Sequence, residues 1–262
     1  MTVWDTRTAE QVREWRPHTD AVRGLAFSPD DRSLATASED GTAKICDVAT
    51  GAEVLTFRGH VRIVYCVAFS PDGRHLATGG QDRTVRIWDA TTGAQIRLLQ
   101  PSAGSVVQVM YAPDGVRLLS RTASGNVKVW QAATGQELAA LSDKRTAATL
   151  DVDGDSLALA RVDGAVAKWN PHTGAQSVII RENSKYIVGV GFSPDGRRLA
   201  TALGEFGVKL WDVKTGQEAF TLPGNFCEVA FSPNGQLLAV ASPDGDVKLW
   251  QASRQPAVKP PR

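Results

Sequence analysis

The stretch FSPDGRHLATGGQDRTVRIWDATTG, from Phe69 to Gly93, decides the fold of this chain. Five further copies of the phrase begin at Phe27, Tyr111, Leu150, Phe192 and Phe231. The aromatic residue near the end of the phrase recurs at Trp4, Trp88, Trp130, Trp169, Trp211 and Trp250, with Cys46 in the same slot. Successive slots lie 42, 42, 42, 39, 42 and 39 residues apart. A repeat of about forty residues with a Trp-Asp signature is typical of small sheets arranged around an axis.

Each copy of the phrase predicts four short strands. In the second copy, Val64 to Phe69 is rich in β-branched and aromatic residues, and Ser70-Pro71-Asp72-Gly73 then predicts a tight turn. The segments HLATGG, TVRIWD and AQIRLLQ follow as three further strands. Asp-Gly and Asn-Gly pairs, the strongest short hairpin signal, recur along the chain, and no stretch has a sustained helical period. The sequence therefore predicts an all-β fold of four-stranded antiparallel sheets.

The six copies resemble the blades of WD-repeat (WD40) β-propellers over nearly the whole chain, from about residue 3 to residue 252. Trp88-Asp89 and Trp211-Asp212 carry the dipeptide that names the family, and Gly59-His60 matches its other marker. The repeat sequences SPDGRRLATA and TVRIWDATTG resemble those of bacterial members of the family. The resemblance implies a WD40-type β-propeller with six blades. A truncated seven-bladed ring is the alternative, because Met1 to Asp5 looks like a third strand without its two inner strands.

We expect residues 1–252 to form a single propeller domain and residues 253–262 to be a Pro-rich basic tail or linker stub. The last copy lacks a fourth strand, because Ser253 to Pro260 is polar and interrupted by proline. Glu10 to Trp15 matches the fourth strand of the other copies. Since an exchange of end segments fastens propellers of this family, this N-terminal strand is expected to close the last blade.

Composition narrows the classes of partner. Lys+Arg 29 against Asp+Glu 28 leaves a formal charge of +1, which gives no electrostatic basis for binding nucleic acid or an anionic membrane. The N-terminus has no apolar run of signal-peptide type, and no segment reaches transmembrane length. The three cysteines fall in predicted strands and do not make a disulfide framework. We therefore expect a cytoplasmic protein, and we expect it to be monomeric.

A set of polar residues in the second copy resembles a catalytic triad. In the family, the positions of His60, Thr78, Asp82 and Trp88 form a hydrogen-bonded relay between strands of one blade. The other copies keep only some of these four residues, so the sequence favours a structural tetrad and no catalytic residues. The repeat tryptophans Trp130, Trp169, Trp211 and Trp250 are likewise predicted to be packing residues.

No cofactor and no metal site are expected. Asp151-Val152-Asp153-Gly154-Asp155 resembles the start of a calcium loop, but Ser156 and Val162 stand where that loop needs Gly and Glu. The segment aligns with the Ser-Pro-Asp-Gly turn of the other copies, and turn chemistry accounts for it. No metal-ligand spacing of Cys and His, phosphate-binding glycine loop or nucleophile elbow is present.

The family resemblance implies a non-catalytic scaffold that binds partner proteins or peptides on one face of the propeller. The alternative is a regulatory or sensor module of a larger bacterial signalling protein such as a kinase. The binding rim is assigned to the loops that enter each first strand and the turns between second and third strands. It comprises Arg62, Ile63, Tyr65, Gln81, Lys144, Arg145, Lys185, Tyr186, Glu205, Asn225 and Phe226. Because this rim gathers basic and aromatic residues, we expect a ligand with acidic and apolar character.

Overall fold

The computed structural model describes residues 1–251 apart from residues 9, 101–103, 143–144, 151–156, 162, 171–172, 174 and 183–186. Within these residues it contains strands and turns and no helix. The strands of the first half are β1 (Thr2–Trp4), β2 (Gln11–Glu14), β3 (Val22–Phe27), β4 (Ser33–Ser38), β5 (Thr42–Asp47), β6 (Glu53–Arg58), β7 (Val64–Phe69), β8 (His75–Gly80), β9 (Val85–Asp89), β10 (Gln95–Leu99), β11 (Val106–Tyr111), β12 (Arg117–Thr122), β13 (Asn126–Gln131) and β14 (Glu137–Ser142). Those of the second half are β15 (Arg145–Leu150), β16 (Leu157–Arg161), β17 (Ala165–Trp169), β18 (Gln176–Arg181), β19 (Gly189–Phe192), β20 (Arg198–Ala202), β21 (Val208–Asp212), β22 (Glu218–Leu222), β23 (Glu228–Phe231), β24 (Leu237–Ala241) and β25 (Val247–Gln251).

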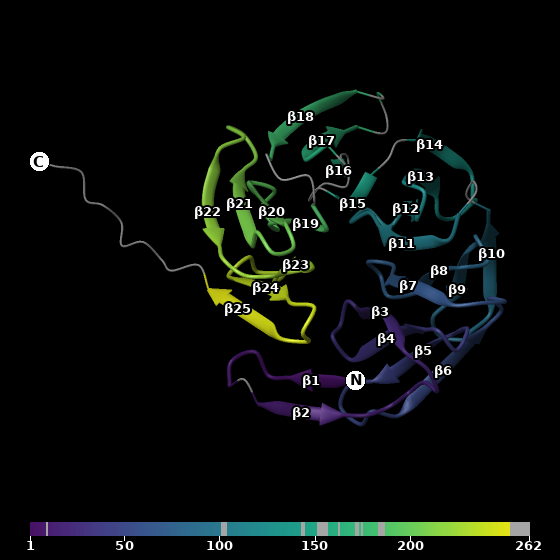
Figure 1. Cartoon of the computed structure of the whole chain (residues 1–262). Helices are drawn as coiled ribbons and strands as arrows, with labels where there is room; N and C mark the ends of the chain where they lie inside the picture. The colour runs from purple at the N-terminus through teal and green to yellow at the C-terminus, as the bar shows by residue number, and fades with distance from the viewer. Residues whose placement is uncertain are drawn as a thin grey trace, which may run out of the picture. The chain divides into compact units, whose positions relative to one another are not determined.

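The strands form consecutive antiparallel sheets, one for each copy of the repeated phrase (Figure 1). The first five blades are four-stranded: β3–β6, β7–β10, β11–β14, β15–β18 and β19–β22. The sixth, β23–β25, has three strands in the described part of the chain, and β1 and β2 form a separate pair. The predicted all-β, six-bladed β-propeller fold is confirmed.

The Ser-Pro-Asp-Gly phrase makes the turn between the first two strands of a blade. The Ser70 hydroxyl donates a hydrogen bond to the Asp72 carboxylate at 2.6 Å and accepts one from the backbone N–H of His75 at 2.9 Å. Gly73 closes the turn with a φ of 72°, a conformation that glycine adopts without steric cost. Local side-chain hydrogen bonds of this kind explain why the hairpin forms where the phrase stands.

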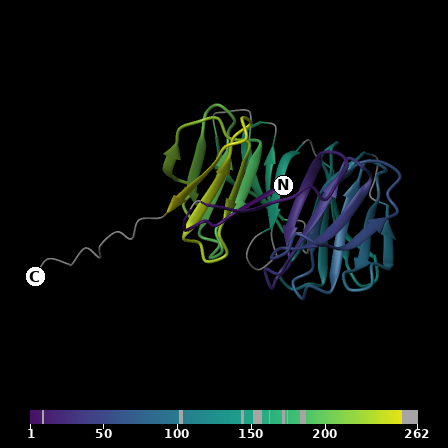
Figure 2. The same ribbon diagram turned by 90° about the horizontal axis from the view of Figure 1, so that it is seen from below.

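The chain divides into two compact units. Unit 1 takes in Met1–Arg145 and contains the first three blades. In it, β7 lies beside both β3 and β11, so the first strands of successive blades are neighbours (Figure 2). The core between blades contains Phe57 and Trp88, whose ring centroids lie 5.4 Å apart. The second blade thus buries the indole of its third strand under the fourth strand of the first blade.

Unit 2 contains most of the fourth blade and the whole of the fifth and sixth blades, and it repeats this packing. Strand β19 lies beside β23, and one core cluster joins Val208, Leu222 and Phe226 to Val229 and Leu238. The second cluster of the unit places Trp211 against buried aliphatic residues that include Ile180. The fold of each unit is therefore set by apolar faces of adjacent sheets.

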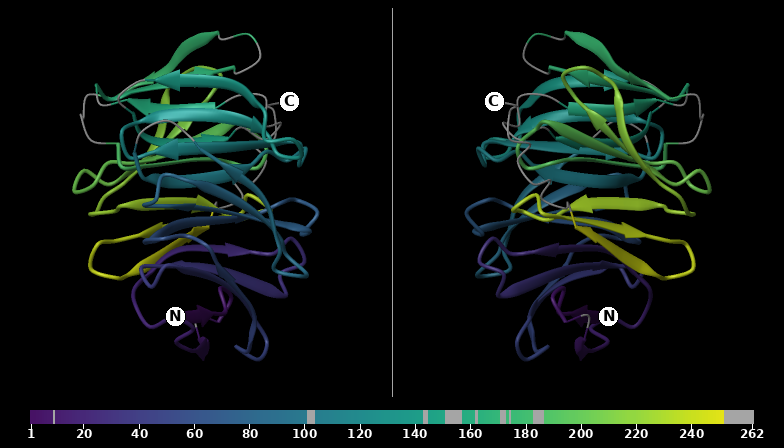
Figure 3. Two further views of the ribbon diagram at one scale, coloured as in Figure 1. Left: turned by 90° about the vertical axis from the view of Figure 1, so that its right-hand side faces the viewer. Right: turned by 90° about the vertical axis from the view of Figure 1, so that its left-hand side faces the viewer.

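The N-terminal pair β1–β2 has the register of the outer half of a blade. Trp4 pairs with Gln11, seven residues further along the chain, as Trp88 pairs with Gln95 in the second blade. A register shift lies next to each of these two pairings. The pair lies beside the first blade (Figure 3), where the Arg13 guanidinium donates to the carbonyls of Ala49 and Thr50. Arg97 of β10 donates to the Ala133 carbonyl in the same way.

The expected closure of the last blade by residues 10–15 is not among the pairings of the described residues. There β2 pairs with β1, and the last blade ends at β25. The exchange therefore stays a prediction. Trp250 of β25 is 39% exposed, whereas Trp88, Trp169 and Trp211 are 3–5% exposed. The indole of Trp250 also borders a recess of about 860 Å³ with Phe220 and Phe231.

Candidate functional site

The residues predicted as a structural tetrad form one continuous hydrogen-bonded relay across the second blade. The Trp88 indole N–H donates to Thr78 Oγ1 at 2.9 Å, and Thr78 Oγ1 lies 2.8 Å from His60 Nε2. His60 Nδ1 lies 3.0 Å from both oxygens of Asp82. Since a carboxylate only accepts, Nδ1 carries the proton, and the Thr78 hydroxyl donates to Nε2. Every polar atom of the relay therefore has a partner.

Burial sets the charge state of this relay. It lowers the pKa of His60, and the neighbouring Asp82 carboxylate only partly opposes that effect. Burial would raise the pKa of Asp82, but hydrogen bonds from His60 and Thr84 lower it below its usual value. The favoured state is a neutral imidazole against a charged carboxylate. The His60 side chain is 2% exposed and Thr78 is fully buried, so neither faces a substrate.

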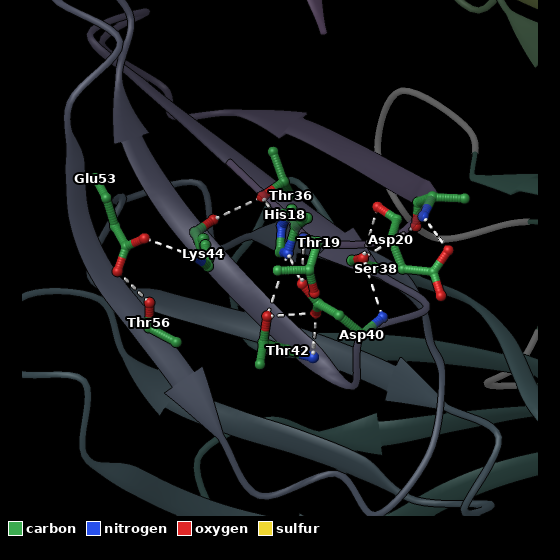
Figure 4. A network of polar contacts seen from close by, with 11 residues as sticks. His18, Thr19, Asp20, Thr36, Ser38, Asp40, Thr42, Lys44, Glu53 and Thr56 are labelled. Atoms are coloured by element: carbon green, nitrogen blue, oxygen red, sulfur yellow. Dashed lines mark hydrogen bonds and ion pairs between the residues drawn. The ribbon is translucent and has the colours of Figure 1, made fainter. Parts of the chain in front are cut away.

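The first blade keeps the same relay without the indole (Figure 4). His18 Nε2 lies 2.7 Å from Thr36 Oγ1, and His18 Nδ1 lies 2.8 Å from the Asp40 carboxylate. The Thr42 hydroxyl donates to the same carboxylate at 2.6 Å. Burial would raise the pKa of Asp40, but the hydrogen bonds from Thr42 and His18 lower it to about 2. The third and fifth blades keep the indole bond, from Trp130 to Ser120 and from Trp211 to Thr201, and the residues at their His position, Ser102 and Asn183, lie outside the described residues.

The predicted rim residues of the second blade lie together at one end of the sheet, which we call the rim end. Arg62 is exposed, whereas Ile63, Tyr65 and Gln81 are half-buried. The Gln81 backbone N–H donates to the Ile63 carbonyl at 2.8 Å, which fixes the turn against the entering loop. Tyr65 lies at a register shift between Val64 and Cys66. Such β-bulges redirect a side chain and are frequent next to functional sites.

A recess of about 430 Å³ opens at this rim end, between the second and third blades. Its walls are Arg62, Gln81, Asp82, Arg83, Gly104 and Ser105. Two of these residues were predicted for the rim, and Asp82 belongs to the relay. Arg83, Gly104 and Ser105 were missed by the sequence reasoning. The signal for Arg83 was present, because Gly41, Gly125 and Gly164 occupy its position in other copies.

The rim end of the first blade differs in charge. Arg23 and Glu39, which correspond to Tyr65 and Gln81 of the second blade, form an ion pair there. In contrast, neither the Arg62 nor the Arg83 guanidinium has a hydrogen-bond or ion-pair partner within the part of the chain that the structure describes. The second blade therefore carries positive charge that is not paired by any of the described residues.

Two of the residues predicted for the rim in unit 2 lie at the surface, and one lies in the core. Glu205 and Asn225 are exposed. Phe226 is 1% exposed and packs in the core, so its assignment to a binding surface is wrong. Its backbone N–H donates to the Gly204 carbonyl, which turns the ring inward beneath the loop. Lys144, Lys185 and Tyr186 lie outside the described residues, as does the side chain of Arg145.

The described residues contain no group of three or more His, Cys, Asp or Glu side chains placed to hold a metal ion. They also contain no helix long and apolar enough to cross a membrane. The thiol of Cys66 is buried, and burial raises its pKa to about 12, so it is not a reactive thiolate at neutral pH.

Comparison with known proteins gives two family matches. A family model described as the IFT122 first beta-propeller matches residues 39–259. A model described as a WD domain, G-beta repeat, matches residues 9–47. No curated protein matches the chain.

Proposed function

The chain belongs to the WD-repeat β-propellers, in the family of the IFT122 first beta-propeller, and we propose that it is a non-catalytic scaffold that binds partner proteins or peptides. A WD40 propeller is a common scaffold for protein interactions and is typically not an enzyme. The proposal places binding at the rim ends of the blades. We also propose that the protein is monomeric and is located in the cytoplasm.

The observation that carries this proposal is the contrast between the relay and the rim. The Ser/Thr-His-Asp sets that resemble a catalytic triad are buried within single blades, with the side chains of His18 and His60 0% and 2% exposed. A substrate therefore has no access to these imidazoles. Arg62, Glu205 and Asn225 are instead exposed at the rim ends, and arginine beside a half-buried tyrosine is typical of binding hot spots.

Affinity capture with matched surface variants tests the proposal. The rim variant is Arg62→Ala/Glu205→Ala, and the control is Arg74→Ala/Arg198→Ala, at the opposite ends of the sheets. We expect the parent and the control to retain the same proteins, identified by mass spectrometry, and the rim variant to lose them. Retention by the rim variant together with loss by the control would place binding at the opposite ends and refute the rim assignment.

A further inference from the structure

We propose that the recess between the second and third blades binds a side-chain oxyanion, a carboxylate or a phosphoryl group, of the docked peptide. This inference depends on the proposed function, since it names the chemical group that one part of the rim recognises. The recess is defined by Arg62 and Gln81 of the second blade and Ser105 of the third, with Arg83 at the tip of the β8–β9 turn. All of these residues lie in unit 1.

The backbone of Arg83 is the first observation that points to a ligand. Arg83 has a φ of 67°, in the left-handed region that side chains other than Gly, Asn and Asp rarely adopt. The corresponding turn positions of four other copies are Gly41, Gly125, Gly164 and Gly245, with φ values from 80° to 93°. The side chain at this position is therefore not required to form the turn, because glycine forms it in four other copies. Its guanidinium is the feature that distinguishes this turn from the others.

The charge balance of the recess is the second observation. Asp82 is the one carboxylate among the lining residues, and its oxygens already accept from His60 and Thr84. Its charge is also shared with Arg86, whose Nη2 lies 3.8 Å away. The guanidinium groups of Arg62 and Arg83 are thus not neutralised by the recess itself, which leaves it cationic in a chain of formal charge +1.

The donors around the recess suit an oxyanion. A guanidinium presents several N–H donors in a planar fork and binds carboxylate or phosphate oxygens bidentately. The Gln81 amide and the Ser105 hydroxyl add neutral donors to the wall. A volume of about 430 Å³ accommodates an acidic side chain together with part of the peptide backbone. A lysine side chain of the peptide would be repelled in the recess by the like charges of Arg62 and Arg83.

The test uses arrays of degenerate nonapeptides with a fixed central Glu, phosphoserine, Gln or Lys, probed with the purified full chain. We expect binding to the Glu or phosphoserine arrays to exceed binding to the Gln and Lys arrays by about tenfold or more, the range expected for charge-assisted contacts. The ratio of Glu to phosphoserine tells which oxyanion source is preferred. Equal binding to Gln and Glu arrays would overturn the inference.

Two variants assign the preference to the recess. Arg83→Gly restores the residue of the other turns and relieves the backbone, so the variant is expected to fold at least as well as the parent. Arg62→Gln keeps a long polar side chain. Each is expected to abolish the preference for acidic peptides, whereas Arg74→Gln, at the opposite end of the same blade, is expected to leave it unchanged.

The outcomes separate this inference from the proposed function. Rim-dependent binding of peptides without a preference for acid, sensitive to Tyr65→Ala but not to Arg83→Gly, leaves the scaffold function in place and overturns the oxyanion site. A preference for acidic peptides that survives in both Arg83→Gly and Arg62→Gln also overturns it, because the charge then acts elsewhere.

Discussion

At the scale of single residues, the buried relay explains how a triad-like set serves the fold. The indole, hydroxyl, imidazole and carboxylate of the second blade connect β8 and β9 to the loop that enters the blade and to the β8–β9 turn. Each member satisfies a polar atom that would otherwise be buried without a partner, which costs more than the bond itself contributes. The relay therefore specifies the sheet geometry.

Trp88→Ala tests this role. The change removes a buried indole that packs on Phe57 and leaves Thr78 without its donor, so we expect the free energy of unfolding to fall by about 3–5 kcal/mol. Trp4→Ala, at an indole that is 56% exposed, is the control and is expected to change it by less than about 1 kcal/mol. A Trp88→Ala protein that melts like the parent but loses its partner would show that the structural assignment is wrong.

The slot of Cys46 provides a second test at this scale. Cys46 is 1% exposed, and the indole of Trp15 contacts both Cys46 and Gly51. Trp15 corresponds to Phe57 of the next copy. In the first blade the large Trp15 therefore packs on the small Cys46, where the second blade packs Phe57 on Trp88. We expect Cys46→Trp alone to destabilise by about 1–3 kcal/mol through overpacking.

The double variant Cys46→Trp/Trp15→Phe recreates the pair of the second blade. It is expected to recover part of the loss in a double-mutant cycle followed by urea unfolding, because the smaller ring at position 15 gives back some of the space that the new indole needs. Strictly additive effects of the two substitutions would contradict the volume exchange.

The pKa of Asp40 leads to a prediction for acid stability. Its folded value of about 2 lies below the usual 3.8, so this carboxylate stabilises the folded state above about pH 4. That contribution is lost as the pH falls from about 4 to about 2. Asp40→Asn is expected to flatten the decline in unfolding free energy over this interval, and Asp246→Asn, an exposed control, to leave it unchanged. A parallel decline in parent and Asp40→Asn would refute the assignment.

At the scale of strands, the first fifteen residues form the outer half of a blade. Trp4 and Gln11 pair as third and fourth strands pair in complete blades, and Trp15 covers Cys46. Removing residues 1–15 uncovers that apolar position and the backbone of the β5–β6 turn. We expect the deletion protein to aggregate or to melt well below the full chain.

Deletion of residues 253–262 serves as the control and is expected to leave the melting temperature unchanged. Differential scanning calorimetry and light scattering on the two truncated proteins are the measurements. Equal melting temperatures and monodispersity for the 1–15 deletion and the full chain would remove the structural role of the hairpin.

The sequence predicts strands and their turns, but it does not decide which strands of different segments pair. The strand Val64 to Phe69 and its turn follow from local composition, and β7 has those bounds. The partner of residues 10–15 does not follow from composition, because a fourth-strand pattern pairs with any free third strand, and Met1 to Asp5 supplies one nearby. The assignment of Phe226 to the binding rim was wrong because the local sequence does not show which way its ring points. A single aromatic in a loop has no periodicity, and only the fold decides whether it points inward.

At the scale of the molecule, neutral overall charge coexists with a locally cationic rim. The formal charge is +1, but the carboxylates of the described blades are largely engaged, as Asp82 is with His60 and Glu39 with Arg23. Arg62 and Arg83 remain available at the rim end of the second blade. The proposed recognition by this surface therefore depends on local charge pairing, which the net charge does not reveal.

The most direct test of the central claim is amide hydrogen exchange of the full chain, alone and with a captured partner. We predict slower exchange on binding in residues 60–65, 80–84 and 104–106, at the rim end of the second and third blades. The turns at residues 28–31 and 70–73, at the opposite ends of the sheets, are predicted to exchange at unchanged rates. Protection confined to those opposite turns, with the rim segments unaffected, would contradict the account.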